Sequence, residues 1–121
     1  MKSSTKSIIH WILTGLVAFI FIGSAVNKLM GSAEAIKMAE SFGISATTFI
    51  LLGVIELIAV ILFVIPRTGI LGTLMLIAFI GGAIATHLEH NQSIVAPVVI
   101  SAFLWIVAVV RFPELTQRIK G

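Results

Sequence analysis

The sequence predicts an all-α integral membrane protein, built as a four-helix bundle with a short interfacial helix between helices one and two. Three observations lead to this prediction. First, 59% of the 121 residues are hydrophobic and only 11% are charged, which is more apolar surface than a chain of this length can bury in water. Second, four apolar runs are each long enough to cross a hydrocarbon core about 30 Å thick. Third, a short segment between the first two runs is amphipathic. We expect one transmembrane domain over residues 1–121.

The first membrane helix is expected over residues 8–28. Lys2 and Lys6 precede this apolar run, as basic residues do in a secretory signal. The run is longer than the apolar core of a signal, which spans about 7–15 residues, so we interpret it as a retained helix. Gly31 and Ser32 then supply a break and an N-cap for the segment that follows.

The interfacial helix is expected over residues 33–42. Its small and apolar residues recur at helical spacing, at Ala35, Met38, Ala39 and Phe42. The opposite face of this segment is polar. A short helix with one apolar face is typical of a segment that lies in the membrane–water interface.

Three further membrane helices are expected over residues 47–65, 68–87 and 94–110. Pro66 stops the first of these three helices, because proline cannot continue the hydrogen-bond ladder, and it begins a tight turn. Thr68 closes the turn, and its hydroxyl is predicted to cap the next helix.

The basic residues are unevenly divided between the two sides of the membrane. With four crossings, the N-terminus, the turn after the second membrane helix and the polar C-terminal tail share one side. The opposite side carries only Lys28 and Lys37. Because positive residues favour the cytoplasm, we expect both termini to be cytoplasmic, in a bacterial inner membrane. The six basic residues on the expected inner side are Lys2, Lys6, Arg67, Arg111, Arg118 and Lys120.

Glu56 is the only charged residue in the run 47–65. A carboxylate at bilayer depth costs several kcal/mol unless it is paired, hydrated or protonated. One interpretation is structural, with a protonated acid that is hydrogen-bonded to a neighbouring helix. The other is functional, with an acid that exchanges protons or binds a ligand in a cleft. Lys28 has two alternatives as well, because its side chain can snorkel to the headgroups or turn inward towards Glu56.

Five polar residues line up from the outer end of the bundle towards its centre. They are Ser24, Asn27, Lys28, Glu56 and His87, and we take them as candidate ligand-binding residues. Such a row is typical of a cavity that opens outwards, although an ordinary outer interface with one buried acid gives the same pattern. No aromatic set that could form a cage for a cation is expected around Glu56.

Several function classes are disfavoured. The chain contains no cysteine, which excludes disulfides, thiol redox relays and cysteine-ligated metals. We find no nucleophile beside a base and no phosphate-binding loop, so no catalytic residue is assigned and the protein is not expected to be an enzyme by itself. His87, Glu89 and His90 resemble half of a metal site, but polar residues are common in interfacial loops, and no metal site is predicted. The net charge of +3 reflects few acids and does not imply nucleic acid.

Four segments together carry a resemblance to a known family. They are IGSAVNKL at 22–29, GVIEL at 53–57, IPRT at 65–68 and GGAIATH at 81–87. In order, spacing and helix layout, roughly residues 10–110 resemble the DoxX-like family of small bacterial membrane proteins. Relatives of that family include subunits of a thiosulfate–quinone oxidoreductase, partners in membrane redox-stress complexes and an animal chaperone for receptor assembly. The resemblance implies fold and membrane placement; its recurring polar residues match Asn27, Lys28, Glu56 and His87.

The leading hypothesis is therefore an accessory or redox-complex-associated membrane subunit. It would bind a lipid-like or quinone-like ligand, or a partner helix, in a polar cleft around Glu56. Two alternatives remain open. One is a small proton-coupled transporter that uses Glu56, and the other is an assembly factor for membrane proteins. The partner beyond the lipid bilayer and the state of oligomerisation stay open.

Overall fold

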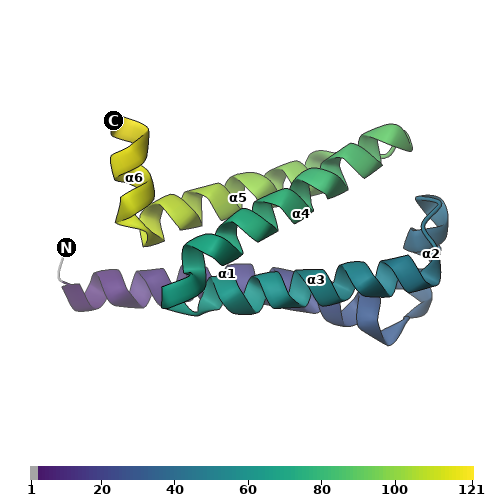
Figure 1. The fold of residues 1–121 in the computed structure, drawn as a ribbon, viewed down its shortest axis with the longest axis horizontal. Coiled ribbons are helices and arrows are strands. Elements are labelled where there is room, and N and C mark those ends of the chain that lie inside the picture. The colour runs from purple at the N-terminus through teal and green to yellow at the C-terminus, as the bar shows by residue number, and fades with distance from the viewer. Residues whose placement is uncertain (1–2) are drawn as a thin grey trace.

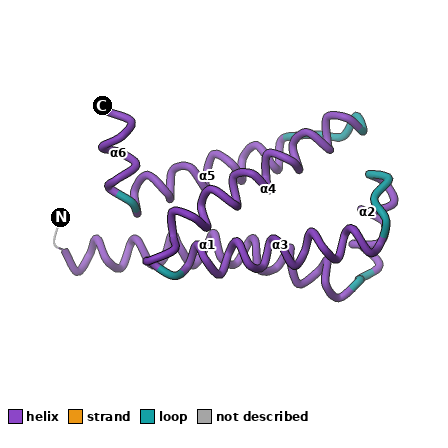
Figure 2. Tube along the Cα trace, in the orientation of Figure 1, coloured by secondary structure: helices purple, strands orange, loops and turns teal. Residues whose placement is uncertain are grey.

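The computed structural model describes residues 3–121, and all regular structure there is helical, with no strand (Figure 2). Lys2, which contributed to the orientation argument, lies outside the described residues. The all-α prediction is confirmed over the described part of the chain. The elements are α1 (Ser3–Met30), α2 (Ala33–Ser41), α3 (Ala46–Val64), the 3₁₀ turn η1 (Pro66–Thr68), α4 (Gly69–Glu89), α5 (Val95–Arg111) and α6 (Pro113–Lys120).

The four long helices pack as two pairs. Helix α1 packs against α3, and α4 packs against α5, while α3–α4 and α1–α5 contacts join the pairs. The pairs lie close together near the end that carries both termini and diverge towards α2 (Figure 1). The resulting V shape leaves its open end beside α2.

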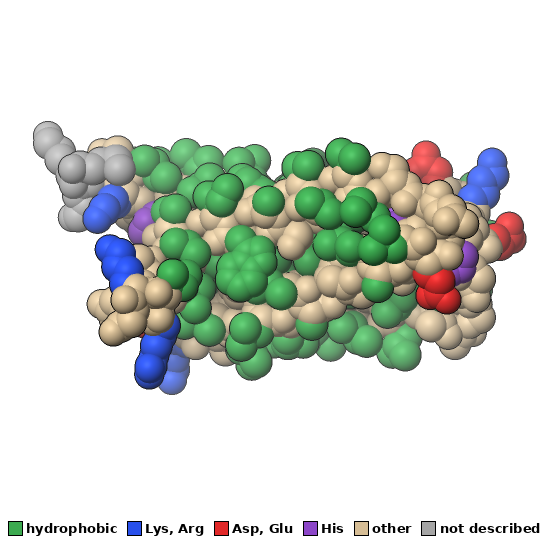
Figure 3. Space-filling view, turned by 90° about the horizontal axis from the view of Figure 1, so that it is seen from above, with side chains coloured by type: hydrophobic (Ala, Val, Ile, Leu, Met, Phe, Trp, Pro, Cys, Tyr) green, Lys and Arg blue, Asp and Glu red, His purple; other side chains and the backbone are tan. Residues whose placement is uncertain are grey.

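The length and composition of the helices are those of a membrane protein. Three helical segments, α1, α3 and η1 with α4, are long and apolar enough to cross a membrane. A fourth crossing is counted if α5 and α6, which are bent by 97° at their junction, form one broken span. The visible face in Figure 3 carries hydrophobic side chains along its middle and charged side chains at its two ends. This arrangement supports a membrane protein with three or four spans.

The closed end of the V contains the apolar core. Phe63, Leu76, Leu104 and Val107 are fully buried there. Gly72 of α4 lies directly against the backbone of Phe63 in α3, with no space for a side chain. This close approach holds α3 and α4 together at the closed end.

Two helix starts are capped as their sequences suggest. Ser32 caps α2, since its hydroxyl accepts a hydrogen bond from the amide of Ala35 at 3.2 Å. Ser45 caps α3 in the same way, through the amide of Thr48. Each cap satisfies an amide that has no partner within its helix. These caps set the direction in which the chain enters each helix.

The predicted cap at Thr68 is wrong. Its side chain makes no capping bond to α4, and its hydroxyl instead donates to the carbonyl oxygen of Leu62 at 2.8 Å. The reason is the 3₁₀ turn after Pro66, which folds back on α3 and presents Thr68 to the unpaired carbonyls at the end of that helix. The threonine therefore closes the helix before it, not the helix after it.

The C-terminal tail, expected only to be polar, forms helix α6. Pro113 occupies the first turn of α6, where a missing N–H is tolerated. Glu114 lies in that first turn and Arg118 and Lys120 lie in the last, which complements the helix dipole. The 97° bend at Phe112 turns α6 across the end of α5.

Candidate functional site: a polar cluster in an apolar cleft

A polar cluster forms where α1 and α3 approach closely. Ser24 and Lys28 lie one turn apart on the same face of α1. Opposite them on α3, a side chain at Gly53 would lie 2.9 Å from Cβ of Lys28 and 3.2 Å from the carbonyl oxygen of Ala25. The missing side chain thus lets the helices come together at this level. Glu56, one turn further along α3, is brought next to both polar residues of α1.

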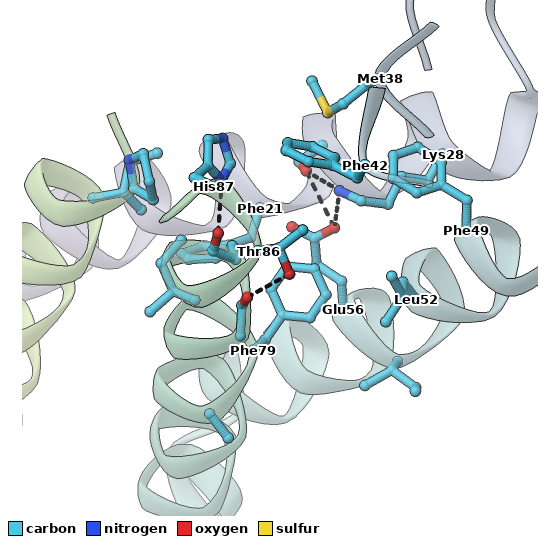
Figure 4. A pocket seen from close by; sticks show the side chains of 18 of the residues that line it. Phe21, Lys28, Met38, Phe42, Phe49, Leu52, Glu56, Phe79, Thr86 and His87 are labelled. Carbon is cyan, nitrogen blue, oxygen red and sulfur yellow. Dashed lines mark hydrogen bonds and ion pairs between the residues drawn. The ribbon is translucent and has the colours of Figure 1, made fainter. Parts of the chain in front are cut away.

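The cluster is a closed network of three hydrogen bonds. The Nζ atom of Lys28 donates to Oε1 of Glu56 at 2.9 Å and to Oγ of Ser24 at 2.6 Å. Ser24 in turn donates to the same Oε1 at 3.2 Å. Figure 4 shows these contacts at one wall of the pocket. Lys28–Glu56 is the only ion pair among residues 3–121.

The burial of the cluster explains why its members must be paired. Glu56 is 1% exposed and the side chain of Lys28 is 11% exposed. An unpaired charge at such a position is strongly destabilising, and an opposite charge with an extra hydrogen bond offsets much of that penalty. Of the two alternatives for Lys28, the structure has the inward one.

Aromatic side chains lie close to the ammonium group of Lys28. Nζ of Lys28 lies 5.4 Å from the ring centroids of both Phe49 and Phe79, within the range of cation–π attraction. Phe42 also lines the pocket. These rings come from α3, α4 and the end of α2, so only the tertiary fold assembles them. In the sequence, the only indication of these contacts was the regular spacing of Met38 and Phe42 on one face of the segment 33–42.

The cluster lies in the wall of a cavity of about 630 Å³. This volume falls within the range of small-molecule sites, about 300–1,000 Å³. The lining is mainly apolar and comes from α1, α2, α3, α4 and α5. Its hydroxyl, charged and imidazole groups belong to five residues, Ser24, Lys28, Glu56, Thr86 and His87.

His87 lines the same cavity on the α4 wall, away from the cluster (Figure 4). Its Nδ1 lies 2.6 Å from the carbonyl oxygen of Ala83. A carbonyl only accepts, so Nδ1 is the donor in this contact. The ring also packs on Phe42, with the centroids 4.8 Å apart. No hydrogen bond joins His87 to the cluster within residues 3–121.

Asn27 is the one candidate residue that the structure places elsewhere. It is exposed and does not line the cavity. Successive residues on a helix are about 100° apart, so Asn27 points well away from the direction that Lys28 shares with Ser24. The structure therefore brings four of the five candidates to one cavity: Ser24, Lys28, Glu56 and His87.

Comparison with known proteins identifies the family. A model of the DoxX-like family matches residues 12–110, which include all four segments that carry the resemblance. A search of curated proteins and a search of solved structures each gave no match. Within residues 3–121, no group of three or more metal-ligating side chains converges. With its apolar helices and this match over most of its length, the chain is a membrane protein of the DoxX-like family.

Proposed function

We propose that this protein is an accessory membrane subunit that binds an amphiphilic, lipid-like or quinone-like molecule in the cleft. The observation that carries the proposal is a largely apolar cavity of about 630 Å³ with one hydrogen-bonded ion pair in its wall. An apolar site with a few placed polar groups suits a ligand that has a polar head and a hydrocarbon tail. The head would lie against Lys28 and Glu56, and the tail along the apolar walls.

The cluster keeps hydrogen-bonding capacity for such a head. An ammonium group has three N–H donors, and the protein takes two of those of Lys28. The second carboxylate oxygen of Glu56 has no hydrogen-bond partner within residues 3–121, yet no buried polar side-chain atom there is unpaired. That oxygen therefore faces the cavity (Figure 4). A carbonyl on the ligand would accept from Lys28, and a hydroxyl would donate to Glu56.

The proposal includes a membrane topology. Helices α1, α3, α4 and α5 would cross the membrane of a bacterium, with α2 in the outer interface and both termini in the cytoplasm. The distribution of positive charge supports this orientation, because the start of α1, the turn between α3 and α4, and α6 lie at the closed end of the V (Figure 1), and these elements carry Lys6, Arg67 and Arg118. The cleft, at the α2 end, would then open towards the outer leaflet.

The ion pair favours ligand binding over proton-coupled cation transport. A transporter of this kind needs an acid that alternates between a proton and the transported cation. In this protein the ammonium group of Lys28 lies 2.9 Å from Oε1 of Glu56, so it already balances the charge of the carboxylate and would repel such a cation. A partner helix that fills the cleft, as an assembly factor would require, is a separate outcome of the test below.

Native mass spectrometry after gentle purification tests the proposal. We expect a small molecule with the mass of a lipid or quinone to remain bound to the wild-type protein. It should be lost in Glu56→Gln, which weakens the polar contacts, and in Ala83→Phe, which fills the cavity without touching the ion pair. Asn27→Ala and Glu89→Gln are matched controls outside the cavity and should keep the ligand.

Two results would reject ligand binding in the cleft. One is a wild-type protein with no bound small molecule under conditions that preserve its fold. The other is a ligand that both Glu56→Gln and Ala83→Phe retain. Co-purification of a stoichiometric membrane protein that Ala83→Phe releases would replace the small ligand with a partner helix.

A further inference from the structure

A second cavity, of about 440 Å³, lies at the opposite end of the molecule from the cleft. The first turns of α1 form one wall, and the junction of α5 and α6 forms another. Lys6 and His10 lie one turn apart on α1, and Arg111 faces the cavity from the end of α5. None of the residues that line this cavity is acidic. The site therefore gathers basic groups without a counter-ion.

The guanidinium group of Arg111 is held in a fixed position. It donates hydrogen bonds to the carbonyl oxygens of Phe63 and Val64, the second at 2.8 Å. These carbonyls lie at the end of α3, where helical partners are missing. The group also lies among three aromatic rings, with Cζ 4.8 Å from the centroid of Phe112 and 5.7 Å from that of Trp11. Arg111 is thus built into the wall rather than free to move.

The charge of Arg111 is not balanced by the protein. Its hydrogen-bond partners are neutral carbonyls, and the only ion pair among residues 3–121 is at the other end of the molecule. A guanidinium has five N–H donors, of which the two carbonyls take two. A partly buried cation beside two further basic groups is stabilised by an anion that enters the cavity.

The expected depth of the site in the membrane indicates the chemical class of this anion. Trp11 lines the cavity and is 52% exposed, and tryptophan at the start of a membrane helix typically lies at the level of the headgroups. Helix α6 turns by 97° from α5 at this level, as expected for a helix that follows the membrane surface. The anion most abundant at that depth is the phosphate of a phospholipid.

We infer that the cavity lined by Lys6, His10, Trp11 and Arg111 binds the phosphate of an anionic phospholipid headgroup. The inference concerns a different cavity from the cleft and does not depend on the function proposed there. Basic pockets between membrane helices are typical sites for anionic headgroups. The bound lipid would supply the counter-charge that the chain lacks.

Fluorescence of Trp11 gives a direct test. Trp105 is the only other tryptophan, so Trp105→Phe leaves Trp11 as the single emitter. The full chain is placed in phosphatidylcholine vesicles that contain a minor fraction of brominated phosphatidylglycerol or, separately, brominated phosphatidylcholine. We expect the anionic brominated lipid to quench Trp11 much more strongly. Each cation removed from the site should reduce its local enrichment by about fivefold.

Matched variants decide whether the site causes the preference. Lys6→Gln with His10→Gln removes two basic groups from the cavity, and neither side chain makes a hydrogen bond within residues 3–121. Lys37→Gln removes one exposed charge at the other end. The preference should fall several-fold in the first variant, which keeps Arg111, and persist unchanged in the second. Equal quenching by both lipids, or a preference that the double change leaves unaltered in a folded protein, would overturn the inference. If inorganic phosphate, but not chloride at equal ionic strength, protects Trp11 from quenching, the site binds free phosphate and the assignment to a lipid is overturned.

Discussion

Nζ of Lys28 lies 2.9 Å from Oε1 of Glu56, although the two residues are 28 positions apart and belong to different helices. Ser24 bonds to both groups, and Gly53 provides the close approach of α1 and α3 that makes the contact geometrically feasible. Each residue therefore offsets much of the free-energy cost of burying the other. The pair is both a tie between two helices and the polar wall of the cleft.

Removing both members of this pair should destabilise the protein by less than the sum of the two single removals. Lys28→Met leaves a buried carboxylate unpaired, and Glu56→Gln leaves a buried ammonium unpaired, at about 3–5 kcal/mol each. The double variant should lose clearly less than the sum of the two single losses, because it leaves neither charge unpaired. Unfolding in detergent measures all four proteins. Asn27→Ala, one position from Lys28 but exposed, should change little. Strict additivity would mean that the ion pair does not form.

Gly72 should tolerate no side chain. A Cβ at this position would overlap the backbone of Phe63, which cannot move without shifting α3. We expect Gly72→Ala to cost about 3 kcal/mol in the free energy of unfolding. Gly81→Ala is the matched control on the same helix, since a Cβ there has no neighbour within 4 Å. It should be neutral or stabilising by up to about 1 kcal/mol. Equal effects at the two positions would contradict the contact between α3 and α4.

The helices were the part of the fold that the sequence predicted well, because apolar runs and breaking residues are local signals. The ends were less accurate, since α1 begins at Ser3 rather than residue 8. Apolar length marks the expected membrane crossing, whereas the helix itself also includes the polar residues 3–7. The tail after Pro113 has little apolar content, so its helix was recognisable only by its first-turn proline and its charges.

The candidate site was only partly accessible to sequence reasoning. Glu56 is a candidate because a lone acid in an apolar run is costly, and Ser24 and Lys28 are candidates because they lie towards the outer end of the first helix. Asn27 is a candidate because it adjoins Lys28 in the sequence, although its side chain points in a different direction from that of Lys28 and is exposed. Phe79 lies on a different helix from Glu56, so its approach to the cluster depends on how α3 and α4 cross. No local pattern encodes that crossing.

Arg111 should contribute to stability mainly through its two hydrogen bonds to the end of α3. Arg111→Met leaves the carbonyls of Phe63 and Val64 without this donor, and we expect a loss of about 2–3 kcal/mol. Arg111→Lys should recover part of it, because a single ammonium does not reproduce the planar fork of a guanidinium. Arg118→Met, which changes an exposed residue of α6, is the control and should stay within about 0.5 kcal/mol of the wild type. Chemical unfolding in detergent gives the comparison; equal losses for Arg111→Met and Arg118→Met would show that the contact to α3 is not stabilising.

The proposed orientation predicts opposite accessibility for α2 and α6. The chain has no cysteine, so single cysteines report on their own positions without background. Glu40→Cys lies on the exposed face of α2, and Gln117→Cys on that of α6. If positive charge keeps the end with the termini in the cytoplasm, a thiol reagent that does not cross membranes should label Glu40→Cys in intact cells. It should label Gln117→Cys only after the membrane is made permeable. Labelling of both positions from outside, or of Gln117→Cys alone, would reverse or reject the topology, and with it the opening of the cleft towards the outer leaflet.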